Sequence, residues 1–266
     1  MGLLDRTDLV ASYFTLTGEH MSKPPRHSLR DRARAAEAAG FTGLALAPAE
    51  VVAAGIDAVV AALGGFPAPE IEPLKGWDSG GRDDEEAVFA LADALGCRQV
   101  TTIQLVGVEE PRLAERFAGM CARAAEHGLT VGFEPRANSP VSTPAAAAAL
   151  ITASGASNAG IVLDAYHVHR AGVGPEDLEP YAHLVVSVQL NDMHATPRPD
   201  PVEDALEFRL TPGDGVIDLH SWLIELDRLG IDAPLAVEVL SRDHNALPLS
   251  EAAGRAAAGG RAALAG

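Results

Sequence analysis

Oxygen-bearing side chains stand at the ends of four short β-like segments in the second half of the sequence: Glu134, Asp164, Gln189 and Glu238. In each segment, bulky apolar residues alternate with small or polar ones. Successive side chains of a strand point to opposite faces, so these polar side chains are expected to share the face opposite the bulky apolar ones. Three carboxylates that face one cavity repel one another unless a cation compensates for them. The pattern therefore predicts a divalent cation at the ends of these strands.

The spacing of the four residues fits consecutive strand–helix units. Asp164 follows Glu134 by 30 residues and Gln189 follows Asp164 by 25, whereas the gap of 49 to Glu238 fits one unit plus a long loop. Carboxylate and amide oxygens are hard ligands that suit Mn²⁺, Mg²⁺ or Co²⁺, and of these we expect Mn²⁺. A single acid at a strand end is usually a helix cap or an ion-pair partner, and the first four predicted strands lack this feature.

Such a site requires strands whose ends meet, and β-like runs alternate with helical stretches along the whole sequence. The predicted strands cover residues 9–15, 43–47, 70–74, 100–106, 130–134, 160–164, 184–190 and 235–240. The predicted helices cover residues 27–39, 49–63, 83–96, 110–127, 143–153, 175–182, 217–228 and 248–264. Alternating strands and helices form right-handed parallel units, so eight units predict an α/β fold, a single (β/α)₈ TIM barrel over residues 1–266. Active sites of such barrels lie at the carboxyl ends of the strands.

One connection is too long for a barrel turn. Residues 191–216 are rich in proline and glycine, and a segment of this length in a compact domain is usually a functional lid or disordered. The sequence therefore predicts a lid-like loop over the presumed active end.

Composition narrows the class of partner. Lys plus Arg number 20 against 37 for Asp plus Glu, which gives a net charge of −17 and argues against nucleic acid and anionic membranes as partners. Cys97 and Cys121 lie in apolar helical stretches without zinc-ligand spacing and are expected to be small buried hydrophobes. The sequence shows no signal peptide and no apolar run of membrane-spanning length, so a cytoplasmic protein is expected.

Several segments of the second half together resemble the xylose isomerase-like TIM barrels of the sugar phosphate isomerase/epimerase family. They are Gly132-Phe-Glu-Pro, Leu163-Asp-Ala-Tyr-His-Val-His-Arg, Val188-Gln-Leu-Asn-Asp, Arg209-Leu-Thr-Pro-Gly-Asp-Gly-Val-Ile-Asp and Val237-Glu-Val-Leu-Ser. The resemblance implies that one divalent metal is held by Glu134, Asp164, Gln189 and Glu238. It also implies that His167 and Arg209 contact substrate oxygens. The first half of the chain matches only the general barrel pattern.

Gln189 departs from the family pattern, because this metal position is often histidine in such proteins. Glutamine keeps an oxygen donor but should weaken the binding of softer metals. Without the family, His167 would be interpreted as a capping or core histidine, and Arg209 as a solvated loop cation.

The resemblance implies proton transfer at a carbon next to a carbonyl, with Glu134 and Glu238 as the catalytic residues that remove and return the proton. We expect a metal-dependent sugar or sugar phosphate isomerase or epimerase. Two alternatives stay open, namely a dehydratase of a keto-polyol of the inosose or 3-dehydroshikimate type, and a non-catalytic sugar-binding barrel. The expected partner is a small sugar or polyol, and a homo-oligomer is compatible with the sequence.

Four further residues are expected in loops near the active end, where each either shapes the sugar pocket or has an ordinary surface role: His20, His194, Glu72 and Trp77. His169 has the opposite strand parity to His167 and is expected to be structural.

Overall fold

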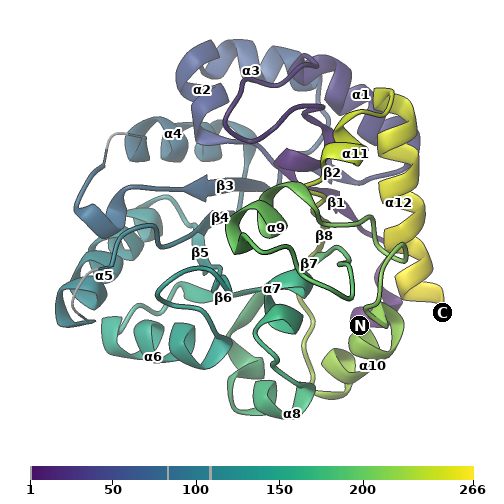
Figure 1. The fold of residues 1–266 in the computed structure, drawn as a ribbon. Helices are drawn as coiled ribbons and strands as arrows, with labels where there is room; N and C mark the ends of the chain where they lie inside the picture. The colour runs from purple at the N-terminus through teal and green to yellow at the C-terminus, as the bar shows by residue number, and fades with distance from the viewer. Residues whose placement is uncertain (1, 83, 108–109) are drawn as a thin grey trace.

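Eight short parallel strands form a ring that is surrounded by helices in the computed structural model, which describes residues 2–82, 84–107 and 110–266 (Figure 1). The strand order is β2-β1-β8-β7-β6-β5-β4-β3, and a parallel bridge between Leu46 and Ile71 joins the two outer strands. The predicted (β/α)₈ barrel is confirmed. The strands are β1 (Val10–Ala11), β2 (Gly43–Leu44), β3 (Glu70–Leu74), β4 (Gln99–Thr102), β5 (Thr130–Phe133), β6 (Ala159–Asp164), β7 (Val185–Leu190) and β8 (Leu235–Val237).

The helices follow the predicted stretches closely where cap residues mark their ends. Ser28 caps the first helix through a hydrogen bond from the Asp31 N–H, and Gly40 ends it at a positive φ of 84°. The helices are α1 (Leu29–Ala39), α2 (Pro48–Ala54), α3 (Ile56–Leu63), α4 (Glu85–Leu95), α5 (Glu110–Glu126), α6 (Pro144–Ser154), α7 (Ala165–Arg170), α8 (Pro175–Leu178), α9 (Pro201–Glu207), α10 (Leu219–Arg228), α11 (Arg242–Asn245) and α12 (Leu249–Ala265). No helix within the described ranges is both long and apolar enough to cross a membrane.

Several predicted boundaries differ from the structure for local reasons. The strand predicted over 9–15 ends at Ala11, and a 3₁₀ helix over Tyr13–Leu16 follows it. The helix predicted over 49–63 is divided into α2 and α3, because Gly55 at φ 80° interrupts it. The helix predicted over 83–96 corresponds to α4, and its first predicted residue, 83, lies outside the described residues.

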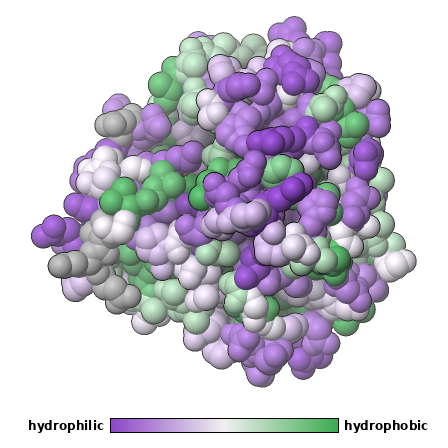
Figure 2. Space-filling view, in the orientation of Figure 1, coloured by the Kyte–Doolittle hydropathy of each residue, from purple (hydrophilic) through white to green (hydrophobic). Residues whose placement is uncertain are grey.

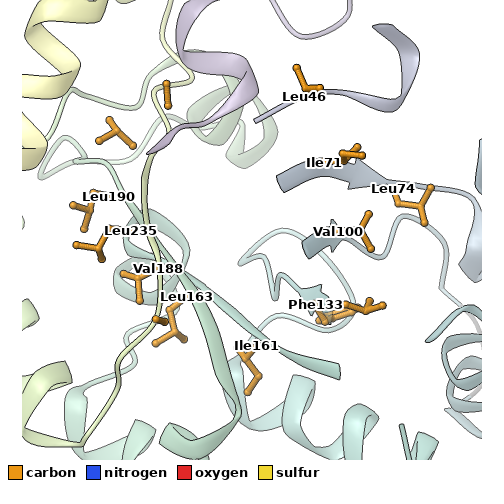
Figure 3. Packing of buried hydrophobic residues seen from close by; sticks show 14 of the residues in the cluster. Leu46, Ile71, Leu74, Val100, Phe133, Ile161, Leu163, Val188, Leu190 and Leu235 are labelled. Atoms are coloured by element: carbon orange, nitrogen blue, oxygen red, sulfur yellow. The ribbon is translucent and has the colours of Figure 1, made fainter. Parts of the chain in front are cut away.

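The hydrophobic core lies between the barrel and the helices. Figure 3 shows the apolar side chains of neighbouring strands in this layer, including Phe133, Ile161, Leu163 and Val188, all of which are fully buried. These residues occupy the alternate strand positions that the sequence pattern assigned to the helix side. The opposite face points into the barrel, which is where the polar residues must lie.

Residues 191–216 form an ordered segment that includes α9, drawn in front of the barrel in Figure 1. The carboxylate of Asp192 accepts hydrogen bonds from the N–H groups of Gly213, Gly215 and Ile217, at 2.9–3.1 Å. Asp204, on α9, accepts a hydrogen bond of 2.7 Å from the Tyr166 hydroxyl. These buried carboxylates fix the fold of the segment and its position against α7.

Candidate active site

The four predicted ligand residues lie together at the carboxyl end of the barrel. Asp164 ends β6 and pairs in register with Gln189 on β7, while Glu134 and Glu238 directly follow β5 and β8. Their exposed fractions are 7% for Glu134, 1% for Asp164, 0% for Gln189 and 4% for Glu238. The predicted convergence of these side chains is therefore present in the structure.

Arg209 is the buried cation of this group. Its Nη1 donates hydrogen bonds to Asp164 Oδ2 at 2.8 Å and to Glu238 Oε2 at 2.7 Å. Its Nε donates to the carbonyl of Ala205, at the end of α9. Burial opposes its charge, but Asp164 and Glu238 outweigh burial and raise the pKa of Arg209 above its ordinary value. The long segment over residues 191–216 thus delivers a permanent positive charge into the site.

His167 lies on the first turn of α7, where the Asp164 carboxylate caps the helix by accepting the His167 N–H at 2.9 Å. The backbone N–H of Ala137 donates to His167 Nδ1 at 3.3 Å, whereas Nε2 faces the guanidinium of Arg209, which can only donate. This Nε2 lies 3.5 Å from Glu134 Oε1 and 3.1 Å from Arg209 Nη2. Burial lowers the pKa of His167 to about 3, against the opposing effect of Asp164, so the ring is neutral at neutral pH.

The three carboxylates have different pKa values because Arg209 does not compensate for them equally. Burial raises the pKa of Glu134 well above its ordinary value, and Glu238 and Asp164 raise it further. Burial also raises the pKa of Glu238, to about 7, although Arg209 opposes this shift. For Asp164 the effect of burial is outweighed by Arg209, by His167 and by a hydrogen bond from Asn191, so its pKa is lowered.

Two further carboxylates lie inside the barrel: that of Glu70, which was not singled out in the sequence, and that of Glu72, which was expected in a loop. Glu70 and Glu72 both lie on β3 and are 5% and 2% exposed, so the expectation of a loop position for Glu72 is wrong. Burial raises the pKa of both, and Glu70 and Glu238 add to the effect at Glu72. The alternation around Ile71 carried the signal, because Glu70 and Glu72 share the face opposite this buried side chain.

The donor set fits a hard divalent cation. Ligand atoms of Glu134, Asp164 and His167 lie within 4.8 Å of one another. Across the described parts of the chain, Glu134 accepts no side-chain hydrogen bond, and the buried Oε1 of Gln189 has no hydrogen-bond partner. An unsatisfied buried oxygen is costly, and a divalent cation would satisfy that of Gln189. This cluster could therefore bind a divalent metal.

Two cavities meet beside this cluster. A cavity of about 30 Å³ touches Glu134, His167, Arg209 and Glu238, and residues of the α9 segment cover it. An adjacent cavity of about 660 Å³ is lined mainly by apolar side chains from α2, α3 and the segment after β1. Phe14, Met21 and Pro73 line both cavities, so the larger one adjoins the site. Figure 2 shows that hydrophilic side chains cover most of the face that Figure 1 presents.

The other residues singled out in the sequence have varied surroundings. Trp77 is 2% exposed and belongs to the core, where its Nε1 donates to the carbonyl of Ile103. His20 is half-buried and lies 3.7 Å from Glu207 of α9, whereas His194 is exposed. His169 packs against Trp222 and has the structural role that was predicted.

Comparison with curated proteins finds a similar protein that is named as an enzyme. Over 169 residues the chain is 29% identical to a 3-dehydroshikimate dehydratase from Pseudomonas aeruginosa strain PAO1. The match covers 61% of this chain and 26% of the relative, so the chain matches about a quarter of the relative's length.

Similar solved structures share the barrel over nearly the whole chain. A fusion protein of a xylose isomerase-like TIM barrel and a 4-hydroxyphenylpyruvate dioxygenase superposes with a TM-score of 0.77 at 20% identity, over 94% of this chain and 41% of the fusion. The IOLI protein with a bound zinc atom superposes with a TM-score of 0.79 at 18% identity, over 97% of this chain and 98% of that protein. These likenesses show the fold.

The family assignment rests on the sequence itself. The sequence profile of the xylose isomerase-like TIM barrels matches residues 33–261, which extends the resemblance from the second half into the first. The chain belongs to the xylose isomerase-like TIM barrel family.

Proposed function

We propose that the protein is a divalent-metal-dependent dehydratase of an acidic keto-polyol, of the 3-dehydroshikimate type. One observation carries the proposal: the carboxylate of Glu134, free of hydrogen bonds among the described residues, lies 3.5 Å from Nε2 of the neutral His167. A base in this position, once it has taken a proton, can return it to a leaving group on the same side of a bound substrate. Removal of a proton and of a hydroxyl from one side is an elimination of water.

The metal would be held by the oxygens of Glu134, Asp164, Gln189 and Glu238, with His167 close by. When bound, it supplies a Lewis acid that stabilises the negative charge developing on the substrate carbonyl oxygen. The Gln189 amide oxygen adds no charge to this set. We expect a site of this composition to prefer Mn²⁺ over softer ions.

In the proposed reaction, Glu134 removes the proton from the carbon next to the carbonyl. Its buried carboxylate, with a raised pKa, is a stronger base than an exposed glutamate. Protonated Glu134 then donates this proton to the hydroxyl on the following carbon, which leaves as water while a carbon–carbon double bond forms. This step returns Glu134 to its carboxylate form, and the neutral His167, 3.5 Å away, is unchanged.

The proposal that the substrate is acidic rests on two cations beside the cavities. Arg136 follows β5 and lines the small cavity, and its buried Nε has no hydrogen-bond partner within the described chain. Lys75 follows β3 and lines the larger cavity, where partial desolvation and nearby Arg136 lower its pKa. In the described part of this acidic chain, neither cation takes part in a salt bridge. A substrate carboxylate between them would relieve their mutual repulsion.

An epimerase is the second candidate, favoured by the pKa of about 7 for Glu238. A group with this pKa suits proton transfer in both directions at neutral pH. An epimerase of this kind needs Glu238 on the opposite side of the substrate from Glu134. The hydrogen bonds from Arg209 and Ser12 to Glu238 make this role less favourable, because they hold the carboxylate in place and reduce its basicity.

The experiment is a panel of substrates assayed with Mn²⁺ and, in parallel, with a chelator. Free and phosphorylated ketoses are compared with 3-dehydroshikimate, and elimination is followed by the near-ultraviolet absorbance of the conjugated product. We expect metal-dependent elimination from the acidic keto-polyol, and a rate loss of at least ~10²-fold in Glu134→Gln. Arg136→Gln should raise KM with little change in kcat. Epimerised ketose without elimination would favour the second candidate, and equal rates with and without chelator would contradict metal dependence.

A further inference from the structure

The amide of Gln189 is held in one orientation inside the barrel. Its Nε2 donates a hydrogen bond of 3.0 Å to Glu72 Oε2, across 117 residues of sequence. Its Oε1 is buried and has no hydrogen-bond partner in the described part of the chain. The amide thus directs its hydrogens to β3 and leaves its oxygen without a partner among the described residues, at the β7 position that pairs in register with Asp164 of β6.

The acceptor that fixes this orientation is a carboxylate whose two oxygens each accept a hydrogen bond. Glu72 is 2% exposed, and its other oxygen, Oε1, accepts the backbone N–H of Tyr13 at 2.8 Å. Two donors, the Tyr13 N–H and the Gln189 Nε2, therefore converge on one side chain. A carboxylate can accept from both, whereas a carboxamide can accept through only one of its two terminal atoms.

We propose that Glu72 is a positioning residue that holds the Gln189 oxygen toward the divalent cation; this inference rests on the metal site of the proposed function. An amide offers a cation either an oxygen, which binds it, or an NH₂ group, which repels it. Without a fixed acceptor on one side, the two orientations of a buried glutamine differ little in energy. In its ionised form Glu72 has no proton to donate, so it removes this ambiguity by requiring a donor from Gln189. The neutral ligand on β7 thereby becomes a directed oxygen donor, as outer partners do for other metal ligands.

The variant Glu72→Gln tests this role with almost no change of shape. The Tyr13 N–H still requires an acceptor, so the new amide must present its NH₂ group to Gln189. Gln189 then turns over to accept that hydrogen bond, and its own NH₂ group faces the cation. We expect Mn²⁺ affinity, measured by calorimetric titration without substrate, to fall about 10–100-fold.

Loss of a buried charge must be separated from loss of orientation. Glu70→Gln is the matched control, because Glu70 is buried on the same strand but bonds Gln99 and Thr101 instead of Gln189. It should change Mn²⁺ affinity by less than about tenfold. Glu72→Asp keeps the charge but shortens the side chain, so it should weaken Mn²⁺ binding as Glu72→Gln does.

A second background decides whether Glu72 acts through Gln189. In Gln189→Met, which removes the amide, the further substitution Glu72→Gln should cost no more than Glu70→Gln does. Thermal unfolding without metal confirms that each variant is folded. The inference is overturned if Glu72→Gln and Glu72→Asp bind Mn²⁺ like the wild type, or if the loss persists in the Gln189→Met background. Wild-type protein that binds no Mn²⁺ would instead refute the metal site of the proposed function.

Discussion

Replacing Arg209 by methionine should destabilise the metal-free protein far more than a typical substitution does. The guanidinium is 2% exposed, and its Nη1 contacts Asp164 and Glu238 at 2.8 and 2.7 Å. Methionine has a similar length but no charge, so both carboxylates lose their buried cation. Removing one partner of a buried ion pair costs about 3–5 kcal/mol, because the remaining charge stays uncompensated. For a chain of this size, such a loss lowers Tm by on the order of 10 °C.

This cost should depend on pH in a defined direction. Without Arg209, the pKa of Glu238 rises further and that of Asp164 is no longer lowered by the guanidinium, so at least one of the two carboxylates stays protonated to a higher pH in the native protein. The unfolded chain releases that proton above about pH 4, so the variant loses stability as pH rises from there to the raised pKa. The slope is about 1.4 kcal/mol per pH unit for one proton. In the wild type Arg209 lowers the pKa of Asp164, so this residue gives the opposite slope.

The assay is urea unfolding of the wild type and Arg209→Met, each with chelator and with Mn²⁺. Arg242→Met is the control, since Arg242 also bridges two carboxylates but its side chain is 57% exposed, where such pairs contribute about 0–1 kcal/mol. Mn²⁺ should reduce the cost of Arg209→Met, because a cation then compensates for the same carboxylates, and by reciprocity the variant should bind Mn²⁺ more tightly. Equal losses for the two variants, or a cost unchanged by Mn²⁺, would refute the reasoning.

Three further outcomes are expected. Gln189→His should shift preference from Mg²⁺ toward Zn²⁺ or Co²⁺ in competitive titrations, since imidazole suits those ions, and an unchanged ranking would mean that Gln189 is not a ligand. Tyr166→Phe removes the hydroxyl donor to Asp204 and should speed protease cleavage within residues 191–216. Mn²⁺ together with a true substrate should slow this cleavage. Equal cleavage rates in all cases would reject the lid role of the segment. Burial lowers the pKa of His244 to about 4, so the folded protein holds this ring in its neutral form. The free energy of unfolding should therefore fall by up to about 3 kcal/mol as pH falls from 6.5 to 4. His244→Gln should reduce that loss in urea unfolding, and identical pH profiles would contradict it.

The barrel and the convergence of its four strand-end residues could be predicted because both follow from alternation. A period of two along each strand places Asp164 and Gln189 inside once Leu163 and Val188 are assigned to the helix side. The same rule, applied to β3, places Glu72 inside the barrel. Its role was missed because only strand ends were searched for acids.

The position of Arg209 lay beyond this rule. Its side chain reaches Asp164 because the segment over 191–216 folds back, and that fold depends on Asp192 and Asp204 accepting hydrogen bonds from distant groups. Contacts of this kind have no periodic signature in a sequence. The split between α2 and α3 at Gly55 is a milder case, since a single glycine within a helical pattern is often tolerated.

The proposed dehydratase activity is tested most directly by the mass of the reaction product. The reaction is run in deuterated water with Mn²⁺ and an acidic keto-polyol such as 3-dehydroshikimate. We expect a product that has lost one molecule of water and absorbs as a conjugated compound. In Glu134→Gln we expect no such product. A product that keeps the full elemental composition of the substrate and carries one deuterium beside the carbonyl would contradict dehydration and establish epimerisation or isomerisation at the same site.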